Sequence, residues 1–124
     1  MENDKRRSPR FECSGIAAVQ VNPLEPPLSA RIADLSLEGC LILLDKPKLL
    51  TLNIMVELIF NVNHLPFRVR AQVRAVRSNA AIGFQFHQVS QRTSLQLEDL
   101  IDELKETAAK RAKAKVMREA MGIA

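Results

Sequence analysis

The segment from Phe67 to Ala75 constrains the fold more than any other part of the chain, because its side chains alternate strictly between apolar and polar. The apolar positions are Phe67, Val69, Ala71, Val73 and Ala75, and the polar positions between them are Arg68, Arg70, Gln72 and Arg74. A period of two residues is that of a β-strand with one buried face and one exposed face. The alternation slips at Val76, which predicts a bulge or the end of the strand.

Five further segments have the composition of short strands, and turn residues separate them. They cover residues 11–21, 28–33, 40–44, 52–60 and 82–86, with Gly15 as a predicted bulge or bend in the first. Six short strands in 124 residues predict one mainly β domain, built as a small antiparallel barrel or sandwich. Closure into a barrel would also remove exposed strand edges.

The C-terminal part of the chain changes to a helical period. Thr93-Ser94-Leu95-Gln96 fits a capping box, in which Thr93 caps the helix and the Gln96 side chain reaches back. Apolar residues then recur at helical spacing, at Leu97, Leu100, Ile101, Leu104 and Ala108. No glycine or proline interrupts residues 93–121, which predicts a helix of about 28 residues, about 42 Å long.

The two halves of this helix differ in what they can pack against. The leucines of the first half can pack on the barrel, or they can start a coiled-coil seam that makes a homo-oligomer. The second half offers mostly alanine, lysine and arginine, so it must find a partner, fray or stand in solvent. Pairing through the helix and contact with another protein both stay open at this point.

The net charge of +4 is unevenly distributed along the chain. Residues 1–10 carry +2, residues 11–104 carry −2 and residues 105–124 carry +4. A nucleic-acid-binding domain is more often basic over one face of its body, and the chain has no Trp or Tyr to stack on bases. A nucleic-acid-binding module that uses Arg68, Arg70, Arg74 and the basic helix is an alternative, but we expect no stable nucleic-acid complex.

Other features narrow the class of protein. Residues 1–10 lack the apolar segment of a signal peptide, and no apolar run reaches the roughly 18 residues of a membrane span. We therefore expect a cytoplasmic protein without a transmembrane segment. The sequence has no nucleophile elbow and no phosphate-binding P-loop, so we expect a binding protein and not an enzyme.

The cysteines and histidines do not predict a metal site. Cys13 and Cys40 are far apart and form no CxxC motif, so we expect both to be reduced and buried. His64 lies in a predicted turn and His87 at a strand end, so we expect both to be solvated. These four residues have none of the close ligand pairs of a zinc site, and we expect no bound metal.

Two polar motifs carry the chemistry. The first is the arginine-rich run that ends at Arg10, and the second runs from Asp34 to Gly39 between two strands. The planar fork of arginine matches phosphate oxygens and also the O6 and N7 acceptors of guanine. A carboxylate such as that of Asp34 can accept from guanine N1–H and N2–H₂. Ser36 adds a hydroxyl, and Gly39 permits a tight turn or a close approach to a ligand. Together they predict a guanine nucleotide as the ligand.

The order Arg6-x-x-x-Arg10 followed by Asp34-x-Ser36-x-x-Gly39 resembles the paired signature of PilZ domains. The resemblance covers residues 6–104, and residues 82–86 resemble a late strand of that family. It implies a six-stranded antiparallel β-barrel with a C-terminal α-helix, which is long here, and cyclic dimeric GMP (c-di-GMP) as regulatory ligand. The implied ligand-binding residues are Arg6, Arg7, Arg10, Asp34, Ser36 and Gly39. The absence of Trp and the longer, more basic C-terminal segment depart from the family pattern.

The resemblance also implies a mechanism. Residues 1–10 form a flexible arm that closes over the nucleotide, residues 11–104 form the barrel with the packed start of the helix, and residues 105–124 form a basic helical extension. Binding would change the conformation and pass a signal to a protein partner in the bacterial cytoplasm. An interaction domain that works without ligand is the other alternative. The downstream process, and whether one or two c-di-GMP molecules bind, stay open.

Overall fold

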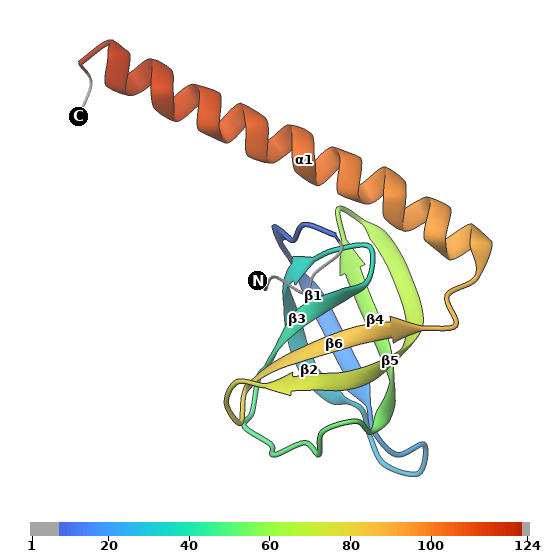
Figure 1. The fold of residues 1–124 in the computed structure, drawn as a ribbon. Helices are drawn as coiled ribbons and strands as arrows, with labels where there is room; N and C mark the ends of the chain where they lie inside the picture. The colour runs from blue at the N-terminus through green and yellow to red at the C-terminus, as the bar shows by residue number, and fades with distance from the viewer. Residues whose placement is uncertain (1–7, 123–124) are drawn as a thin grey trace, which may run out of the picture.

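A computed structural model describes residues 8–122, which form six strands and one helix (Figure 1). The elements are β1 (Phe11–Gln20), β2 (Leu28–Leu35), β3 (Gly39–Leu44), β4 (Met55–Val62), β5 (Leu65–Val76), β6 (Ala81–His87) and α1 (Gln91–Ala120). The strands form a closed barrel in the order β1-β2-β3-β6-β5-β4, and all neighbouring strands are antiparallel. The predicted mainly β fold, a six-stranded antiparallel barrel with a long C-terminal helix, is confirmed.

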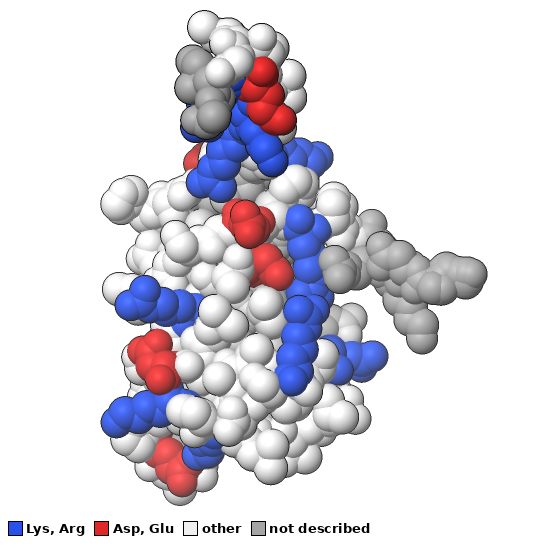
Figure 2. Space-filling model, turned by 90° about the vertical axis from the view of Figure 1, so that its left-hand side faces the viewer, with Lys and Arg blue, Asp and Glu red and all other residues white. Residues whose placement is uncertain are grey.

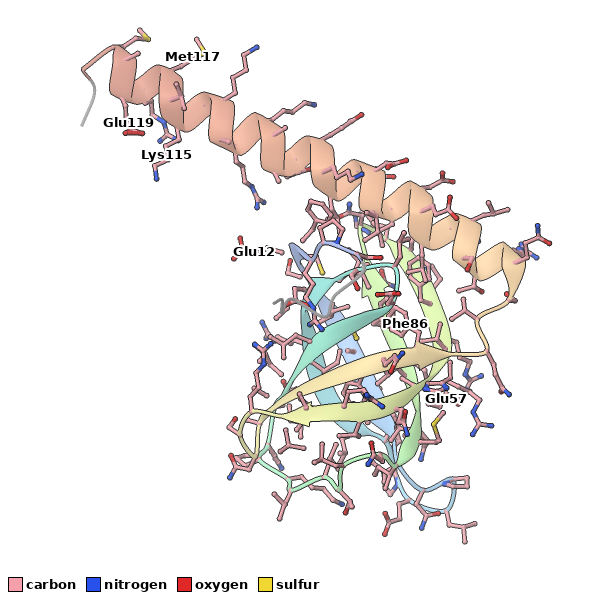
Figure 3. The ribbon with its side chains drawn as sticks, viewed as in Figure 1. Glu12, Glu57, Phe86, Lys115, Met117 and Glu119 are labelled. Atoms are coloured by element: carbon pink, nitrogen blue, oxygen red, sulfur yellow. The ribbon has the colours of Figure 1, made fainter. Side chains whose placement is uncertain are left out.

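The interior of the barrel follows the alternation that the sequence predicts. On β5, Phe67 and Val69 are buried while Arg68 between them is exposed. The ring of Phe60 on β4 stacks on those of Phe67 and Phe86, with centroid separations of 5.2 and 6.1 Å (Figure 3 labels Phe86). Burial of such apolar side chains, at about 1.5–3 kcal/mol each, is the main force that holds the barrel together.

Two predicted irregularities are present in the sheet. The pairing of β1 with β2 shifts register between Glu12 and Gly15, which confirms a bulge in the first strand. The pairing of β5 with β6 shifts between Val73 and Ala75, so the bulged residue is Arg74 and the strand continues to Val76. A bulge re-aims the side chain of the extra residue, and Arg74 is therefore directed differently from the regular row of exposed arginines before it.

Several predicted boundaries were wrong. β2 runs to Leu35 and β3 begins at Gly39, so Asp34 and Gly39 lie within strands and not between them. The fourth strand begins at Met55 and not at Leu52, because Asn53 has a left-handed backbone (φ 72°) that interrupts an extended strand. The predicted turn over residues 61–66 is shorter, because β4 runs to Val62 and β5 begins at Leu65. Asn63 and His64, with φ values of 52° and 68°, form the two-residue hairpin turn.

The helix begins earlier than predicted, because its N-cap is Ser90 and not Thr93. The Ser90 hydroxyl accepts a hydrogen bond from the Thr93 backbone N–H at 3.1 Å and donates one to the Thr93 hydroxyl at 3.0 Å. Serine at this position satisfies one of the free N–H groups of the first turn. Thr93 therefore lies inside the helix, which is about 45 Å long for its 30 residues.

The helix crosses one end of the barrel and then projects beyond it (Figure 1). Leu97, Leu100, Ile101 and Leu104 are buried, whereas every described residue from Lys105 onward is exposed. The barrel thus occupies the apolar face that could have served as a coiled-coil seam. The second half of the helix is exposed along its whole described length, so it is not covered by the barrel.

Replacement of Ser90 by alanine tests the assignment of the N-cap. Loss of the cap is expected to cost about 1 kcal/mol, which lowers the melting temperature by about 3–5 °C. Thr93→Ala should cost less, because the backbone N–H that donates to Ser90 is kept. Thermal unfolding followed by circular dichroism measures both. A larger loss for Thr93→Ala than for Ser90→Ala would contradict the assignment.

Candidate functional site

The two polar motifs meet at one end of the barrel. Arg10 directly precedes β1 and Asp34 lies near the end of β2, and antiparallel pairing sets Glu12 opposite Asp34. The Arg10 guanidinium donates from Nη1 to Oδ1 of Asp34 at 3.2 Å, and the two side chains are 23% and 20% exposed. The Arg10 Nε–H is buried and has no hydrogen-bond partner among residues 8–122. The ion pair therefore joins the two motifs and leaves one donor free.

Ser36 uses its hydroxyl to hold the turn between β2 and β3. The Ser36 Oγ accepts from the backbone N–H groups of Glu38 at 3.2 Å and Gly39 at 3.1 Å, and it donates to the Gly39 carbonyl oxygen at 3.3 Å. The Ser36 backbone N–H donates to the same carbonyl at 2.9 Å. Ser36 is only 4% exposed, so in the described structure it shapes the turn.

Gly39 is required by the packing of two strands. A Cβ atom at this position would lie 2.1 Å from the carbonyl oxygen of Phe84 on β6, which is far closer than atoms can approach. The sequence suggested a tight turn or a close approach to a ligand. The close approach found here is to the neighbouring strand, so Gly39 positions the turn that carries Ser36.

A pocket of about 250 Å³ opens beside these residues. Besides Arg10, Ser36 and Gly39, its lining includes Arg74 on β5 and Arg77 just after that strand. The alternation predicted Arg74 as part of an exposed arginine row, and the sequence predicted neither residue for the site. The slip of the alternation at Val76 was a signal, because a bulge turns Arg74 toward β6 and the pocket.

The other predicted site residues, Arg6 and Arg7, lie outside the described residues and stay predictions. Arg10, Asp34, Ser36 and Gly39 do come together, although they belong to two segments that are far apart in the sequence. The pocket thus combines three guanidinium groups with the acidic side chain of Glu38. Such a set can bind phosphate oxygens and guanine edges.

The cysteines near this end of the barrel are unreactive thiols. Burial, with a smaller effect of the nearby Asp34 charge, raises the pKa of Cys13 to about 12 and also raises the pKa of Cys40. Both cysteines are free; Cys40 is buried as predicted, whereas Cys13 is only partly buried because it lies in the bulged part of β1. A thiol with so high a pKa stays protonated at neutral pH and is a poor nucleophile.

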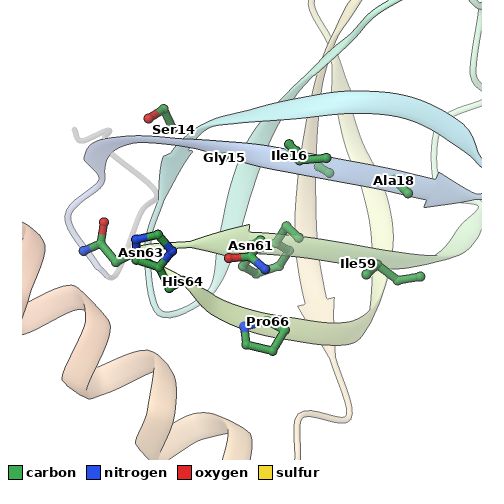
Figure 4. Close-up of a pocket in the computed structure, with 11 residues that line it drawn as sticks. Ser14, Gly15, Ile16, Ala18, Ile59, Asn61, Asn63, His64 and Pro66 are labelled. Carbon is green, nitrogen blue, oxygen red and sulfur yellow. The ribbon is translucent and has the colours of Figure 1, made fainter.

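A larger hollow, of about 590 Å³, lies elsewhere, on β1 and β4 (Figure 4). It is lined mainly by apolar or uncharged side chains, such as Ile16, Ile59 and Pro66, and holds none of the motif residues. Its lining offers no Asp, Glu, Lys or Arg for catalysis or for recognition of an anion. The smaller pocket at Arg10 is therefore the better candidate site.

The two histidines lie in a turn and at the end of a strand, as the sequence predicted. His64 is exposed in the β4–β5 turn, and His87 lies within hydrogen-bond distance (3.2 Å) of the Gln72 side chain. Within residues 8–122, no three His, Cys, Asp or Glu side chains gather closely enough to hold a metal ion. The described part of the chain also has no helix that is both long and apolar enough to cross a membrane.

Comparisons with solved structures agree with this fold. The PilZ domain of YcgR from Escherichia coli, solved with c-di-GMP, has a TM-score of 0.68 and 23% identity, and the match covers 89% of this chain and 98% of that one. A second YcgR structure with c-di-GMP gives a TM-score of 0.74 and 23% identity over 90% of this chain and 50% of that one. The inhibitor of motility MotI from Bacillus subtilis has a TM-score of 0.65 and 12% identity, and the match covers 89% of this chain and 54% of that one. This chain thus spans about half of the YcgR and MotI chains in the latter two structures.

The sequence identifies the family independently of these folds. A search of curated protein sequences gives no match. The sequence model of the PilZ domain, however, matches residues 4–103, which include both motifs and all six strands. The chain therefore belongs to the PilZ domain family.

Proposed function

We propose that this chain is a bacterial, cytoplasmic c-di-GMP receptor that changes conformation on binding and passes the signal to a protein partner. The observation that carries this proposal is the ion pair between Arg10 and Asp34. It joins the two family motifs at the edge of a pocket that also holds Arg74 and Arg77. YcgR, which shares the fold, is solved with c-di-GMP.

The charges of the pocket suit a dinucleotide with two phosphate groups. Arg10, Arg74 and Arg77 supply positive charge and planar donors, and each charge-assisted hydrogen bond contributes about 1.5–3 kcal/mol. The free Nε–H of Arg10 gains an acceptor when a phosphate or guanine oxygen binds. The carboxylate of Asp34 has accepting capacity beyond its single contact with Arg10, so it can receive the guanine N–H donors.

The N-terminal arm supplies the conformational change in this proposal. Residues 1–10 carry Arg6 and Arg7, which contact the guanine edges and phosphates as the arm closes over the nucleotide. Arg10 then exchanges part of its bond to Asp34 for bonds to the ligand. Fixing the arm costs about 1–2 kcal/mol per residue, which offsets part of the binding energy and keeps the switch reversible. Ser36 and Gly39 act through the turn that holds Asp34 in place.

The output in this proposal is a protein contact and not a reaction. The cysteine thiols are protonated and buried or half-buried, and the pocket is rich in arginine, which suits binding of an anion. MotI, an inhibitor of motility, shares the fold, and in this proposal the domain acts on another protein. The barrel with the start of α1 is the receptor, and residues 105–124 are an extension available for contacts.

Calorimetric titration of the full chain with c-di-GMP tests the proposal. Saturable heat with one or two molecules per chain is expected, and GMP should compete poorly because it has only one guanine. Absence of heat would overturn the proposal. A gel shift with generic DNA and RNA at several salt concentrations tests the nucleic-acid alternative, for which strongly salt-dependent binding would be the sign.

Replacement of Arg74 by alanine tests the part of the pocket that the sequence did not predict. Loss of one charge-assisted contact is expected to weaken c-di-GMP binding about tenfold. Arg68→Ala is the matched control, because Arg68 lies on the same strand but is paired with Glu57 at 3.2 Å, outside the pocket. Equal affinities of the two variants would show that β5 does not contribute to the site.

A further inference from the structure

The helix α1 carries its charges in two opposite blocks. The acidic block consists of Glu98, Asp99, Asp102, Glu103 and Glu106, with Lys105 as the one basic residue inside it, and the basic block consists of Lys110, Arg111, Lys113, Lys115 and Arg118, with Glu119 directly after it. The helix dipole does not account for the acidic block, because its effect is confined to the terminal turns and the first turn of α1 holds no acidic residue. The two blocks lie in the middle and the projecting part of the helix.

Both blocks are exposed and have few binding partners among residues 8–122. All ten side chains are exposed, and Figure 2 shows basic side chains gathered on the projecting part of the helix. Among residues 8–122, no member of either block takes part in an ion pair. Glu103 accepts one hydrogen bond from the Asn63 side chain at 3.3 Å. The charge of the helix is therefore available to a partner.

Apolar side chains accompany these charges on the exposed surface of the helix. Leu95 is 54% exposed, and Val116, Met117 and Met121 are 63%, 54% and 68% exposed. Figure 3 shows Lys115, Met117 and Glu119 on the part of the helix that extends past the barrel. Alanines at positions 109 and 120 would let a second helix approach closely.

We propose that α1 pairs in antiparallel orientation with α1 of a second copy of this chain. On the face of α1 opposite to its buried leucines, antiparallel pairing sets the acidic block of each copy against Lys110 and Lys113 of the other, whereas parallel pairing would set like charges together. The other three basic residues lie on the side of the buried leucines and take no part in the pairing. The opposite charge of the two blocks thus selects both the partner and the direction. This inference is independent of c-di-GMP binding.

One exposed face of α1 fits this arrangement. By helical periodicity, Leu95, Asp102, Lys113 and Ala120 lie on the face opposite to the buried leucines. An alignment that sets Leu95 opposite Ala120 of the second copy also sets Asp102 opposite Lys113 and brings Glu103 near Lys110. Because this face points away from the barrel, the two barrels lie on opposite sides of the helix pair and do not collide.

The expected dimer is weak and sensitive to salt. The paired length, over residues 95–120, is about 39 Å, but the shared face contains few large apolar side chains. Exposed ion pairs contribute only about 0.2–1 kcal/mol each. Salt screens them over about 10 Å at 0.1 M. Charge therefore directs the pairing, and the exposed Leu95, Val116 and Met117 add modest burial.

Sedimentation equilibrium of the full chain without nucleotide, over a concentration series at low and high salt, is the first measurement. We expect a reversible dimer at low salt that dissociates at high salt. Lys110→Glu with Lys113→Glu reverses the basic block, and Asp102→Lys with Glu103→Lys reverses part of the acidic block. Each double variant alone should dimerise at least about tenfold more weakly than the unchanged chain.

The mixture of the two double variants is the sharpest test. Their reversed charges complement each other, so the mixture should form a heterodimer although neither variant dimerises alone. Lys46→Glu with Lys48→Glu, in the exposed loop after β3, changes the net charge as much as Lys110→Glu with Lys113→Glu does, and it should leave dimerisation unchanged. Circular dichroism checks that each variant keeps its helix. A monomer at low salt, a dimer that survives charge reversal, or a mixture that stays monomeric would each overturn the proposal.

Discussion

Replacement of Arg10 by alanine is expected to weaken c-di-GMP binding at least about a hundredfold. Arg10 is the described residue that contacts the other motif directly, and it also lines the arginine-rich pocket. Its removal deletes at least two charge-assisted hydrogen bonds, each worth about 1.5–3 kcal/mol. Calorimetric titration measures the loss. The affinity of Arg10→Lys should lie between those of the unchanged chain and of Arg10→Ala, because lysine keeps the charge and loses the planar fork.

The fold should survive this change, so the loss of binding is separable from unfolding. Exposed ion pairs contribute about 0–1 kcal/mol, and the Arg10–Asp34 pair is partly buried with a single contact at 3.2 Å. The melting temperature should therefore fall by only a few degrees. Asp34→Ala is a second variant to titrate, and we expect it also to bind c-di-GMP more weakly than the unchanged chain. Tighter binding by Asp34→Ala would mean that Asp34 only holds Arg10 away from the ligand, against the proposed role.

Gly39→Ala is expected to lower the melting temperature by about 10 °C, the largest stability effect that we predict. The added Cβ would lie 2.1 Å from the Phe84 carbonyl oxygen and 3.1 Å from its carbon. These are backbone atoms of β6, so β3 and β6 must move apart to relieve the overlap. Overpacking of this kind costs about 1–3 kcal/mol, and about 2–3 kcal/mol corresponds to the stated change in a domain of this size.

Thermal unfolding without nucleotide separates the two readings of the glycine. Leu37→Ala is the control, because Leu37 lies in the same turn and is 42% exposed, so its melting temperature should change little. An unchanged melting temperature of Gly39→Ala with weakened c-di-GMP binding would place the glycine against the ligand. A lower melting temperature confirms that the glycine serves the approach of β3 to β6.

Local pattern was enough to predict the elements and the family. The period of two from Phe67 to Ala75 depends only on which residues face the interior, and β5 confirms it. The apolar spacing that begins at Leu97 predicted the helix for the same reason. The boundaries were harder, because they depend on single interactions. Ser90 and Thr93 are both good caps, and the hydrogen bond from the Thr93 N–H to Ser90 decides between them.

The sequence by itself determined the six strands, the helix and the two motifs that carry Arg10, Asp34, Ser36 and Gly39, since these follow from side-chain chemistry over short spans. Only the tertiary structure decided which segments are neighbours. The strand order β3-β6-β5 brings Arg74 and Arg77 to the pocket and sets Phe84 against Gly39. An apolar helix face requires burial but does not specify its partner. The leucines of α1 therefore pack on the barrel, and the charged face is left to the surface.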